Sequence, residues 1–452
     1  MKNIIIGAGP AGRLAGIELG KLGEETLLIE KNDLGGTCLN KGCMVICALN
    51  DIARFLNNKR QYEKLGLISG DIEISYEEIV NKIIKTQKVI HEIDYEENTS
   101  LNNEIIYGKA QLTENEVSVG GETWEWENLL IATGGNPFIP NIPGKKYGLT
   151  NEDILKLKKV PEKLNIMGGS VIAAEISNIY SSFGSEVNII ARSNFLSELD
   201  PEIKDYIVKN LLKNVNIYEN TDTKEIQKNK IIVENNGETK EFKGNTFIAT
   251  GRSPNSEIAR KILQDDDFDN RGAIKVNDLM QTSNPNIYAA GDVTGGINLT
   301  PVARMEGILA ARNMAGYLNK IEYNTIPQSI QLEMDVSFAN KTNFDKNKDG
   351  NKNKDNDKNI NENKETIDIS SPGSAGPGGF WKVLTKDTGI TKASFDSQTN
   401  LLESITAISP SSISDIAYIS YLMRTGENIS NFDEFVEVHP STDVFFQIMK
   451  YI

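Results

Sequence analysis

The stretch Gly35-Gly36-Thr37-Cys38-Leu39-Asn40-Lys41-Gly42-Cys43 contains two of the three cysteines in the 452-residue chain. The spacing between Cys38 and Cys43 is just over one helical turn, so on the first turn of a helix the two sulfurs could meet and form a disulfide. A helix N-terminus also favours a thiolate, so either sulfur could be reactive. The alternative is a pair of buried structural thiols, since cysteine is often a small core residue.

A glycine-rich stretch upstream of the cysteines favours redox chemistry over a structural role. Gly7-Ala8-Gly9-Pro10-Ala11-Gly12 follows the apolar run Ile4-Ile5-Ile6 and predicts a strand, a tight turn and a helix. In such a turn the first glycine allows the bend, the second lets the backbone approach a pyrophosphate, and the third lets the helix pack on the strand. Glu30 ends the next apolar run, where a carboxylate can bind ribose hydroxyls. We therefore predict dinucleotide binding.

The cysteine stretch resembles the redox-disulfide motif of the flavin-dependent pyridine nucleotide–disulfide oxidoreductases, and it reproduces the pattern Gly-Gly-Thr-Cys-x-Asn-x-Gly-Cys in full. That family includes dihydrolipoamide dehydrogenase, glutathione reductase and mercuric reductase. The resemblance implies FAD at the first turn, with Gly36 and Thr37 among its contacts. It also implies that Cys43 lies nearest the flavin ring and that Cys38 attacks or releases the substrate.

Two further stretches resemble flavin-binding segments of the same family. Leu129-Leu130-Ile131-Ala132-Thr133-Gly134 resembles the strand at which the chain leaves the flavin domain. Asp292 ends another apolar run, and the resemblance implies that it binds the ribityl chain of FAD, although an acid there could merely cap a helix. The following Leu299-Thr300-Pro301-Val302-Ala303 extends the similarity. We therefore count Thr133, Gly134, Asp292 and Ala303 among the expected FAD contacts.

A second dinucleotide unit is predicted at residues 163–192, with the turn Gly168-Gly169-Ser170-Val171-Ile172-Ala173. Compared with the usual glycine pattern, Ser170 replaces the middle glycine and Ala173 the last, and alanine is common there. The serine side chain stands where a pyrophosphate should approach most closely. We therefore expect weaker binding of the nicotinamide cofactor or a displaced loop. Gly251, in the second Ala-Thr-Gly stretch, is a further expected contact.

The end of the second unit bears on the choice between NAD and NADP. NAD-preferring members of the family carry an acid where this chain has Ala191. The neighbouring Arg192 could instead pair with a 2′-phosphate, as the similarity to the NADPH-using reductases implies. The alternative is a solvated arginine at a strand end. Both nicotinamide cofactors remain candidates.

One position near the cysteines departs from the family. Where the family has a lysine beside the flavin, this chain has Cys47. The family's glutamate partner of that lysine is matched by Glu175, counted here as a nicotinamide-site residue. An acid that loses its cationic partner must find another or take up a proton. Cys47 is either a packed helix residue or a third thiol near the site.

The C-terminal Val438-His439-Pro440 resembles the family's His-Pro, which reaches across a dimer to the partner's disulfide. The resemblance implies that His439 is the general acid–base, a role suited to the pKa of histidine. The alternative is a histidine in a turn. Where the family has a carboxylate that orients the ring, this chain has Val444. Either Asp443 substitutes for that carboxylate or the imidazole is less well oriented.

The expected fold class is α/β, with two Rossmann-like dinucleotide-binding domains and an α+β C-terminal dimerisation domain. The predicted boundaries are 1–144 and 255–325 for FAD, 145–254 for NAD(P) and 326–452 for dimerisation. An insertion at about 343–379 is expected to be disordered, because residues 343–364 are almost entirely Asn, Lys, Asp and Glu. Its mixed charge argues against a metal-binding loop, and we predict no metal site. Strands are expected to resume at residues 380–384, and a helix is expected near 413–425.

Composition excludes several functional classes. The formal net charge of −15 makes nucleic acid an improbable partner, and no apolar run is long enough to span a bilayer. The N-terminus leads directly into a predicted strand, so we expect a cytoplasmic protein. In a reducing compartment a cysteine pair is more often catalytic than structural.

The predicted function is an FAD-dependent exchange of electrons between NAD(P)H and a dithiol or disulfide substrate, with dihydrolipoyl dehydrogenase as the most similar activity. The expected partners are a second copy of the chain and a small substrate, with lipoyl groups of a multienzyme complex as one candidate. One alternative is an NADPH-dependent disulfide or mercuric-type reductase, although the C-terminal cysteine pair of mercuric reductases is absent. Another is a flavoprotein NAD(P)H oxidase or partner protein without disulfide turnover.

Overall fold

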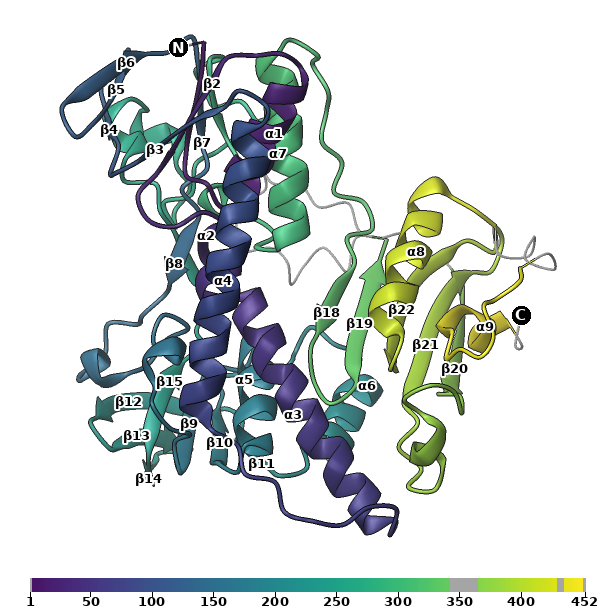
Figure 1. Cartoon of the computed structure of the whole chain (residues 1–452). Coiled ribbons are helices and arrows are strands. Elements are labelled where there is room, and N and C mark those ends of the chain that lie inside the picture. The colour runs from purple at the N-terminus through teal and green to yellow at the C-terminus, as the bar shows by residue number, and fades with distance from the viewer. Residues whose placement is uncertain (1, 342–364, 429–434, 450–452) are drawn as a thin grey trace.

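The computed structural model describes residues 2–341, 365–428 and 435–449 (Figure 1). Two parallel sheets with helices against them form the first three-quarters of the chain, and an antiparallel sheet with helices forms the last quarter. The α/β fold class with an α+β C-terminal unit is therefore as predicted. Figure 1 places the C-terminal sheet beside α3 (Cys43–Lys64), to the right of the two parallel-sheet units.

The first sheet is parallel and has the order β17-β7-β1-β2-β3. Its central strand is completely buried, as expected for a parallel strand with helices on both faces. Gly307 of α7 lets that helix approach α1 closely, because a Cβ there would lie 2.1 Å from the carbonyl oxygen of Ala11. The elements of this unit are β1 (Asn3–Ile6), α1 (Pro10–Lys21), β2 (Thr26–Glu30), β3 (Glu104–Tyr107), β7 (Asn128–Ile131), β17 (Ile287–Ala289) and α7 (Thr300–Met314).

Three helices and a small antiparallel sheet are inserted between β2 and β7. The long helix α4 begins at Ser75, whose hydroxyl accepts a hydrogen bond from the backbone N–H of Glu78 and so caps the first turn. Figure 1 shows α3 and α4 extending from the first unit toward the second. The inserted elements are α2 (Gly36–Lys41), α3, α4 (Tyr76–Thr99), β4 (Gln111–Leu112), β5 (Glu116–Val119) and β6 (Glu122–Glu125).

The second parallel sheet has the order β11-β10-β9-β15, and an antiparallel sheet β12-β13-β14 packs beside it. Ile190, Ile226 and Val233 are among the buried residues that join the two sheets. The elements are β9 (Lys163–Met167), α5 (Val171–Ser182), β10 (Glu186–Ile190), α6 (Pro201–Tyr206), β11 (Val215–Tyr218), β12 (Asp222–Gln227), β13 (Lys230–Asn235), β14 (Glu238–Lys243) and β15 (Asn245–Ile248).

The two chain segments that connect the parallel-sheet units pair with each other. β8 (Gly135–Pro137) and β16 (Arg252–Pro254) form an antiparallel two-stranded sheet. The hydroxyl of Thr133 donates to the carbonyl oxygen of Asn255 at 2.6 Å, and the hydroxyl of Thr250 donates to the carbonyl oxygen of Phe138 at 2.7 Å. The threonine of each predicted Ala-Thr-Gly stretch is therefore hydrogen-bonded to the other connecting segment.

The C-terminal sheet is antiparallel, with the order β18-β19-β22-β21-β20. Buried apolar residues of β22, α8 and α9, including Ile405, Ile419 and Phe445, form its core. The predicted helix near 413–425 is thereby confirmed as α8. The elements are β18 (Gln328–Ile330), β19 (Asp335–Asn340), β20 (Thr366–Pro372), β21 (Ile390–Asp396), β22 (Leu402–Ser409), α8 (Ser412–Thr425) and α9 (Val444–Met449).

Two local predictions in this unit are wrong. Residues Phe380–Val383 form a 3-10 turn instead of a strand, with Phe380 62% and Trp381 41% exposed, so their apolar character did not indicate a buried strand. β20 lies within the segment expected to be disordered and pairs with β21 over seven residues. The strand was not predicted because it lies at the edge of the sheet and is mostly exposed, with only Ile369 and Ser371 buried. The prediction for residues 343–364 lies outside the described residues.

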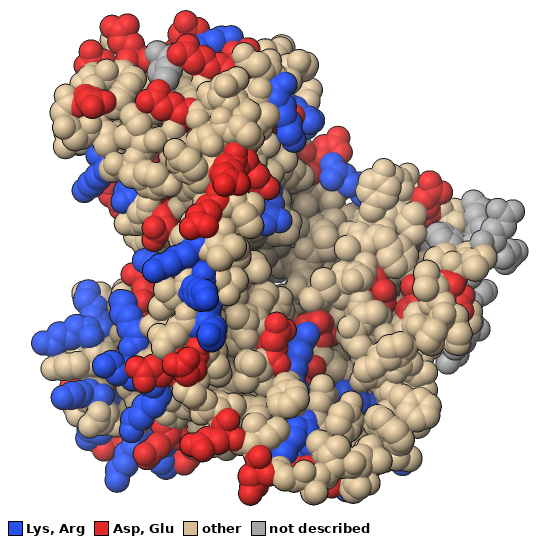
Figure 2. Space-filling model, in the orientation of Figure 1, with Lys and Arg blue, Asp and Glu red and all other residues tan. Residues whose placement is uncertain are grey.

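Surface charge is unevenly distributed. Figure 2 shows Lys and Arg gathered at the lower left, where Figure 1 places β12–β14. Three of the lysines on these strands lie close to glutamates of the same small sheet: Lys224 to Glu234, Lys230 to Glu241 and Lys240 to Glu238. Much of this positive charge is therefore paired locally.

Candidate active site at the Cys38–Cys43 pair

The predicted redox segment lies against the first glycine turn. A Cβ at Gly36 would lie only 2.7 Å from the Cα of Gly9, so the two backbones can approach this closely only because residue 36 is glycine. The backbone N–H of Gly35 also donates to the carbonyl oxygen of Ala8 at 2.9 Å. The cysteines are therefore held beside the N-terminus of α1.

Cys38 and Cys43 lie on two helices, which corrects the expected single first turn. Cys38 is in α2, Cys43 begins α3, and Gly42 between them has the non-helical angles φ −129° and ψ −125°. A Cβ at Gly42 would lie 2.9 Å from the carbonyl oxygen of Thr37, so a larger residue would not fit this bend without a shift. Both cysteines are free thiols, Cys38 half-buried and Cys43 exposed.

The two thiols share a hydrogen bond, and it makes them unequal. The S–H of Cys38 donates to the sulfur of Cys43, which lowers the pKa of Cys43 to about 6 and raises that of Cys38. Burial opposes the shift at Cys43, and the hydroxyl of Thr300 adds to it. At neutral pH Cys43 is therefore the thiolate and Cys38 keeps its proton.

Sequence reasoning missed two side chains of α7 that lie near these sulfurs. The Oγ1 of Thr300 is 3.6 Å from the Sγ of Cys43. The positive charge of Arg304 partly offsets the raised pKa of Cys38. Thr300 stands in the stretch that resembles the family, yet nothing local marks it as a thiol neighbour. Its place follows from the packing of α7 against the first sheet.

His91 of α4 also supports the redox segment, although the sequence indicated no role for it. Its Nε2 lies 2.7 Å from the Oδ1 of Asn40, and the side-chain amide of Gln87 donates to the carbonyl oxygen of Leu39 at 2.9 Å. The amide of Asn40 in turn donates to the carbonyl oxygen of Gly36 at 3.0 Å. These contacts fix the helix that carries Cys38.

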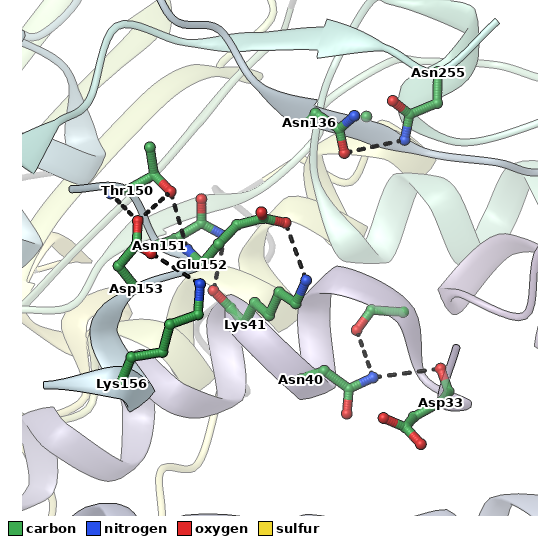
Figure 3. A network of polar contacts seen from close by, with 12 residues as sticks. Asp33, Asn40, Lys41, Asn136, Thr150, Asn151, Glu152, Asp153, Lys156 and Asn255 are labelled. Carbon is green, nitrogen blue, oxygen red and sulfur yellow. Dashed lines mark hydrogen bonds and ion pairs between the residues drawn. The ribbon is translucent and has the colours of Figure 1, made fainter. Parts of the chain in front are cut away.

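The end of α2 is tied to the second unit, as Figure 3 shows. The Nζ of Lys41 lies 3.0 Å from the Oε1 of Glu152, and the amide of Asn151 donates to the carbonyl oxygen of Lys41 at 2.9 Å. The same view shows Asp153 accepting from the hydroxyl of Thr150. The redox segment therefore bridges the two parallel-sheet units.

The predicted FAD residues fit a dinucleotide. Gly7 has a φ of +102°, and a Cβ at Gly12 would lie 1.8 Å from the carbonyl oxygen of Gly7, so both positions require glycine. Glu30 accepts from the backbone N–H groups of Ala8 at 2.7 Å and Asn32 at 2.9 Å. Its carboxylate keeps further lone pairs for ribose hydroxyls. The N-terminus of α1 is left to the phosphates.

Asp292 follows β17 and lies where this strand meets α1 and α7. A Cβ at Gly291 would be 3.3 Å from the Cβ of Ala11 and 3.5 Å from that of Ala303, so the junction is tight. The Oδ2 of Asp292 accepts from the Nε of Arg252 at 2.8 Å. This contact fixes the carboxylate beside the first turn, where its remaining lone pairs can accept hydrogen bonds from a polyhydroxyl chain.

The second turn has the same backbone course as the first, so the expected displacement of the loop does not occur. Ser170 has φ −94° and ψ −178°, close to φ −71° and ψ −173° at Gly9. Gly168 resembles Gly7, since a Cβ there would lie 2.2 Å from the carbonyl oxygen of Ala249. The serine side chain is the difference that remains at this turn.

The other predicted nicotinamide-site residues surround this second sheet. Ala173 is completely buried in α5, and a Cβ at Gly169 would lie 2.9 Å from that of Ala191. Arg192 is exposed and forms no ion pair within residues 2–341, 365–428 and 435–449. Gly251 has a φ of +111° with open space around it.

Glu175 and Cys47 lie close together, like the family's lysine–glutamate pair whose positions they occupy. The Oε1 of Glu175 accepts from the backbone N–H of Gln331 at 3.0 Å. Burial, and secondarily the negative charge of Cys43, raises the pKa of Glu175 to about 7. Burial also raises the pKa of Cys47, against a hydrogen bond with the Gln331 side chain. The acid has therefore found a backbone donor and not a cation.

His439 is not brought to the cysteines within one chain. It is exposed, and among the described residues no contact joins it to Cys38 or Cys43. Asp443 accepts instead from the hydroxyl of Tyr418 at 3.0 Å and from the backbone N–H of Phe446 at 3.0 Å. Val444 is completely buried in the C-terminal core. Of the two alternatives, the structure favours an imidazole without a carboxylate partner from its own chain.

No group of three or more His, Cys, Asp or Glu side chains in residues 2–341, 365–428 and 435–449 is arranged to hold a metal ion. Within the same part of the chain, no helix is long and apolar enough to cross a membrane.

The fold and site define a class of protein with two dinucleotide units and a thiol pair beside the first. Residues 1–307 match the family described as pyridine nucleotide-disulphide oxidoreductase, and the chain belongs to that family. It is therefore an FAD-dependent disulfide oxidoreductase that uses NAD(P)H.

Relatives of the chain include enzymes that are named for different activities. The chain is 29% identical to dihydrolipoyl dehydrogenase of Mycoplasma pneumoniae, over 97% of this chain and 95% of the relative. It is 33% identical to a mercuric reductase of Bacillus cereus, over 72% of this chain and 53% of the relative. The solved structure of the HOCl-induced flavoprotein disulfide reductase RclA from Escherichia coli has a similar fold, with a TM-score of 0.82, 23% identity, and 99% and 100% of the two chains covered.

Proposed function

We propose that the protein transfers electrons between NAD(P)H and a small dithiol or disulfide substrate through Cys38 and Cys43, and that its activity is that of a dihydrolipoyl dehydrogenase. The observation that carries the proposal is the hydrogen-bonded thiol pair, with the pKa of Cys43 lowered to about 6, beside the glycine turn of a dinucleotide unit. The full-length similarity to the Mycoplasma pneumoniae enzyme supports the choice of substrate.

Each domain receives one cofactor in this proposal. Residues 1–144 and 255–325 hold FAD, with the turn glycines and the N-terminus of α1 at its pyrophosphate, Glu30 at a ribose and Asp292 at the ribityl chain. Residues 145–254 hold the nicotinamide cofactor at the turn that contains Ser170. When bound, FAD supplies the two-electron chemistry that links the nicotinamide to the thiol pair.

The different protonation of the two thiols gives each cysteine a different role. Cys43, already a thiolate at neutral pH, needs no base before it reacts. Cys38 holds its proton, so a base must remove that proton before Cys38 attacks a substrate disulfide, and an acid must return it when a substrate thiol leaves. We assign this proton transfer to His439 of a second copy of the chain, because Val438-His439-Pro440 resembles the family's His-Pro and His439 is exposed.

The proposed homodimer can be tested by subunit complementation. Cys43→Ser and His439→Ala proteins should each be inactive with dihydrolipoamide. A refolded equal mixture should recover about a quarter of the wild-type activity, because half of the dimers then contain one intact site of two. The matched control mixes Cys43→Ser with Cys38→Ser, which places a lesion in both cysteine pairs and should stay inactive.

Two different outcomes would contradict the proposed disulfide exchange and the proposed role of His439. If Cys43→Ser retains the turnover of wild type, disulfide exchange is not the activity, and a flavoprotein oxidase or partner role gains support. If the Cys43→Ser and His439→Ala mixture stays inactive while size-exclusion shows mixed dimers, His439 does not act across the subunits.

A second candidate is an NADPH-linked disulfide reductase. Arg192 favours it, because this residue is exposed and forms no ion pair with the described residues. Ala191 leaves no acid at the strand end that would repel a 2′-phosphate. Steady-state kinetics with both nicotinamides test it: Arg192→Ala should raise the KM for NADPH about tenfold, as expected for loss of a charge-assisted contact, and leave that for NADH unchanged. Equal effects on the two KM values would exclude this candidate.

A further inference from the structure

The helices α3 and α5 pack along a polar seam that begins next to the thiol pair. The amide of Asn178 donates to the Oδ1 of Asn50 at 2.9 Å, and one to two turns further on the amide of Asn57 donates to the hydroxyl of Ser182 at 2.9 Å. Glu175 and Cys47 each lie three residues before the Asn178–Asn50 pair. They therefore occupy the seam position nearest to Cys43, which lies one turn before Cys47 on α3.

The segment that follows β18 closes this seam. The backbone N–H of Gln331 donates to Glu175 at 3.0 Å, while the carbonyl oxygen of Leu332 accepts from the amide of Asn50 at 3.3 Å and from the Nε of Arg54 at 2.7 Å. The side chain of Gln331 also forms a hydrogen bond with the thiol of Cys47. Glu175 is thus held in a fixed position by a neutral donor.

The charged groups that face Glu175 are mostly acidic. Cys43 and Asp335 both raise its pKa, and Cys47 and Asp51 of α3 lie in the same cluster. Of the cations near them, Arg54 forms an ion pair with Asp335, and Arg304 of α7 acts on Cys38. Among the described residues, no Lys or Arg forms an ion pair with Glu175. Burial raises the pKa of Glu175 to about 7, so this carboxyl can gain or lose a proton near neutral pH.

We propose that Glu175 takes up a proton when the Cys38–Cys43 disulfide is reduced and releases it when the disulfide re-forms. The negative charge that appears on Cys43 favours the neutral form of a carboxyl beside it, and by linkage the neutral carboxyl favours the thiolate. The inference rests on the proposed function, because it requires that Cys38 and Cys43 cycle between dithiol and disulfide.

The reaction with a dithiol then balances within the site. The dithiol loses two electrons and two protons and forms its own S–S bond, and the bond between Cys38 and Cys43 breaks. Of the two protons that the dithiol loses, one goes to Cys38 and the other to the carboxylate of Glu175, and Cys43 becomes a thiolate. To the extent that Glu175 takes up this proton, the site carries the same negative charge before and after reduction, so less charge has to be added to a partly buried, mostly acidic cluster.

Proton counting tests this proposal directly. The oxidised holoenzyme is reduced anaerobically at pH 7 with stoichiometric dithiothreitol in weakly buffered solution, and a pH indicator reports the protons released per disulfide reduced. Wild type should release fewer protons than Glu175→Gln, by up to about half a proton, because only the wild type has the titrating carboxyl and burial already raises its pKa before reduction. Cys47→Lys places a cation beside Glu175, should keep it ionised, and should give the same count as Glu175→Gln.

Two controls keep the test specific. Asp415→Asn removes another buried acid with a raised pKa, which lies in the C-terminal unit, and Cys47→Ser keeps a neutral group on α3. Both should release the wild-type number of protons. Equal counts in wild type, Glu175→Gln and Cys47→Lys would overturn the proposal. A wild-type protein whose Cys38–Cys43 disulfide does not form or cannot be reduced would instead overturn the proposed function.

Discussion

The Sγ of Cys43 lies 3.6 Å from the Oγ1 of Thr300, a residue 257 positions further along the chain. Cys43 begins α3 and Thr300 begins α7, so two helix N-termini meet at the reactive sulfur. A hydroxyl that donates to a thiolate stabilises its charge, and a helix N-terminus does so as well. The hydroxyl of Thr300 and the N-termini of α3 and α7 therefore all stabilise the thiolate of Cys43.

Thr300→Val should slow the reaction of Cys43 with iodoacetamide. Valine removes the donor and keeps the shape of the side chain, so the pKa of Cys43 should rise from about 6. At pH 6 the alkylation rate, followed by mass spectrometry of the Cys43 peptide, should fall about threefold, and at pH 9 it should be unchanged. Thr425→Val at the end of α8 is the matched control. An unchanged rate at pH 6 would contradict the assigned role of Thr300.

Replacing Cys38 should raise the pKa of Cys43 more than Thr300→Val does, because the Cys38 thiol is the largest cause of the lowered value. Cys38→Ala removes the donor, whereas Cys38→Ser keeps a hydroxyl at the same place. We expect the pH midpoint of Cys43 alkylation to rise in the order wild type, Cys38→Ser, Cys38→Ala. The prediction fails if the alanine and serine variants titrate together.

Ser170→Gly should strengthen binding of the nicotinamide cofactor. Ser170 has an extended backbone like that of Gly9, so glycine relieves no strain and only removes a side chain from the turn. The KM for the preferred nicotinamide should fall with kcat unchanged, while the free energy of unfolding falls by up to about 1 kcal/mol because glycine is more flexible when unfolded.

The reciprocal change is the control for that prediction. A Cβ at Gly9 would lie 3.8 Å from the Cα of Gly36, an ordinary contact, so Gly9→Ser should fold. It should nevertheless lose FAD more readily during dialysis, because it places a side chain at the pyrophosphate position. A Ser170→Gly protein with an unchanged KM would show that the serine does not obstruct the cofactor.

Asp415 should make the C-terminal unit less stable as pH rises through the acidic range. Burial raises the pKa of Asp415 to about 6 against hydrogen bonds from Ser411 and from the backbone N–H of Val444. The folded state then binds a proton more tightly than the unfolded state, whose carboxyl has a pKa near 3.8. This stabilisation is complete below about pH 4 and is lost as pH rises toward 6.

Asp415→Asn keeps an oxygen acceptor for both donors and removes the ionisation. The quantity to compare is the free energy of unfolding in urea of the variant minus that of wild type. This difference should be about 1 to 2 kcal/mol larger at pH 7.5 than at pH 5, as expected for about one unit of pKa shift titrated over that range. A difference that does not change with pH would contradict the raised pKa.

The local parts of this protein could be predicted from short stretches of its sequence. The two glycine turns, the strands before them and the cysteine stretch each follow from residues close together in the chain, because a tight turn or a helix start depends on a few neighbouring backbone angles. The α/β class followed from the order of those pieces. Where apolar or polar character was interpreted without its context, at Phe380–Val383 and in β20, the local prediction was wrong.

Contacts between groups that are distant in the sequence were seen only in the folded protein. The close approach of Gly36 to Gly9, the contact of Thr300 with Cys43, and the backbone donor that Gln331 gives to Glu175 all join separate elements. Their positions depend on how helices pack on the sheets, which no short pattern encodes. For the same reason, the separation of His439 from the cysteines of its own chain became visible only in the folded structure, since sequence resemblance assigns a role to a residue without placing it.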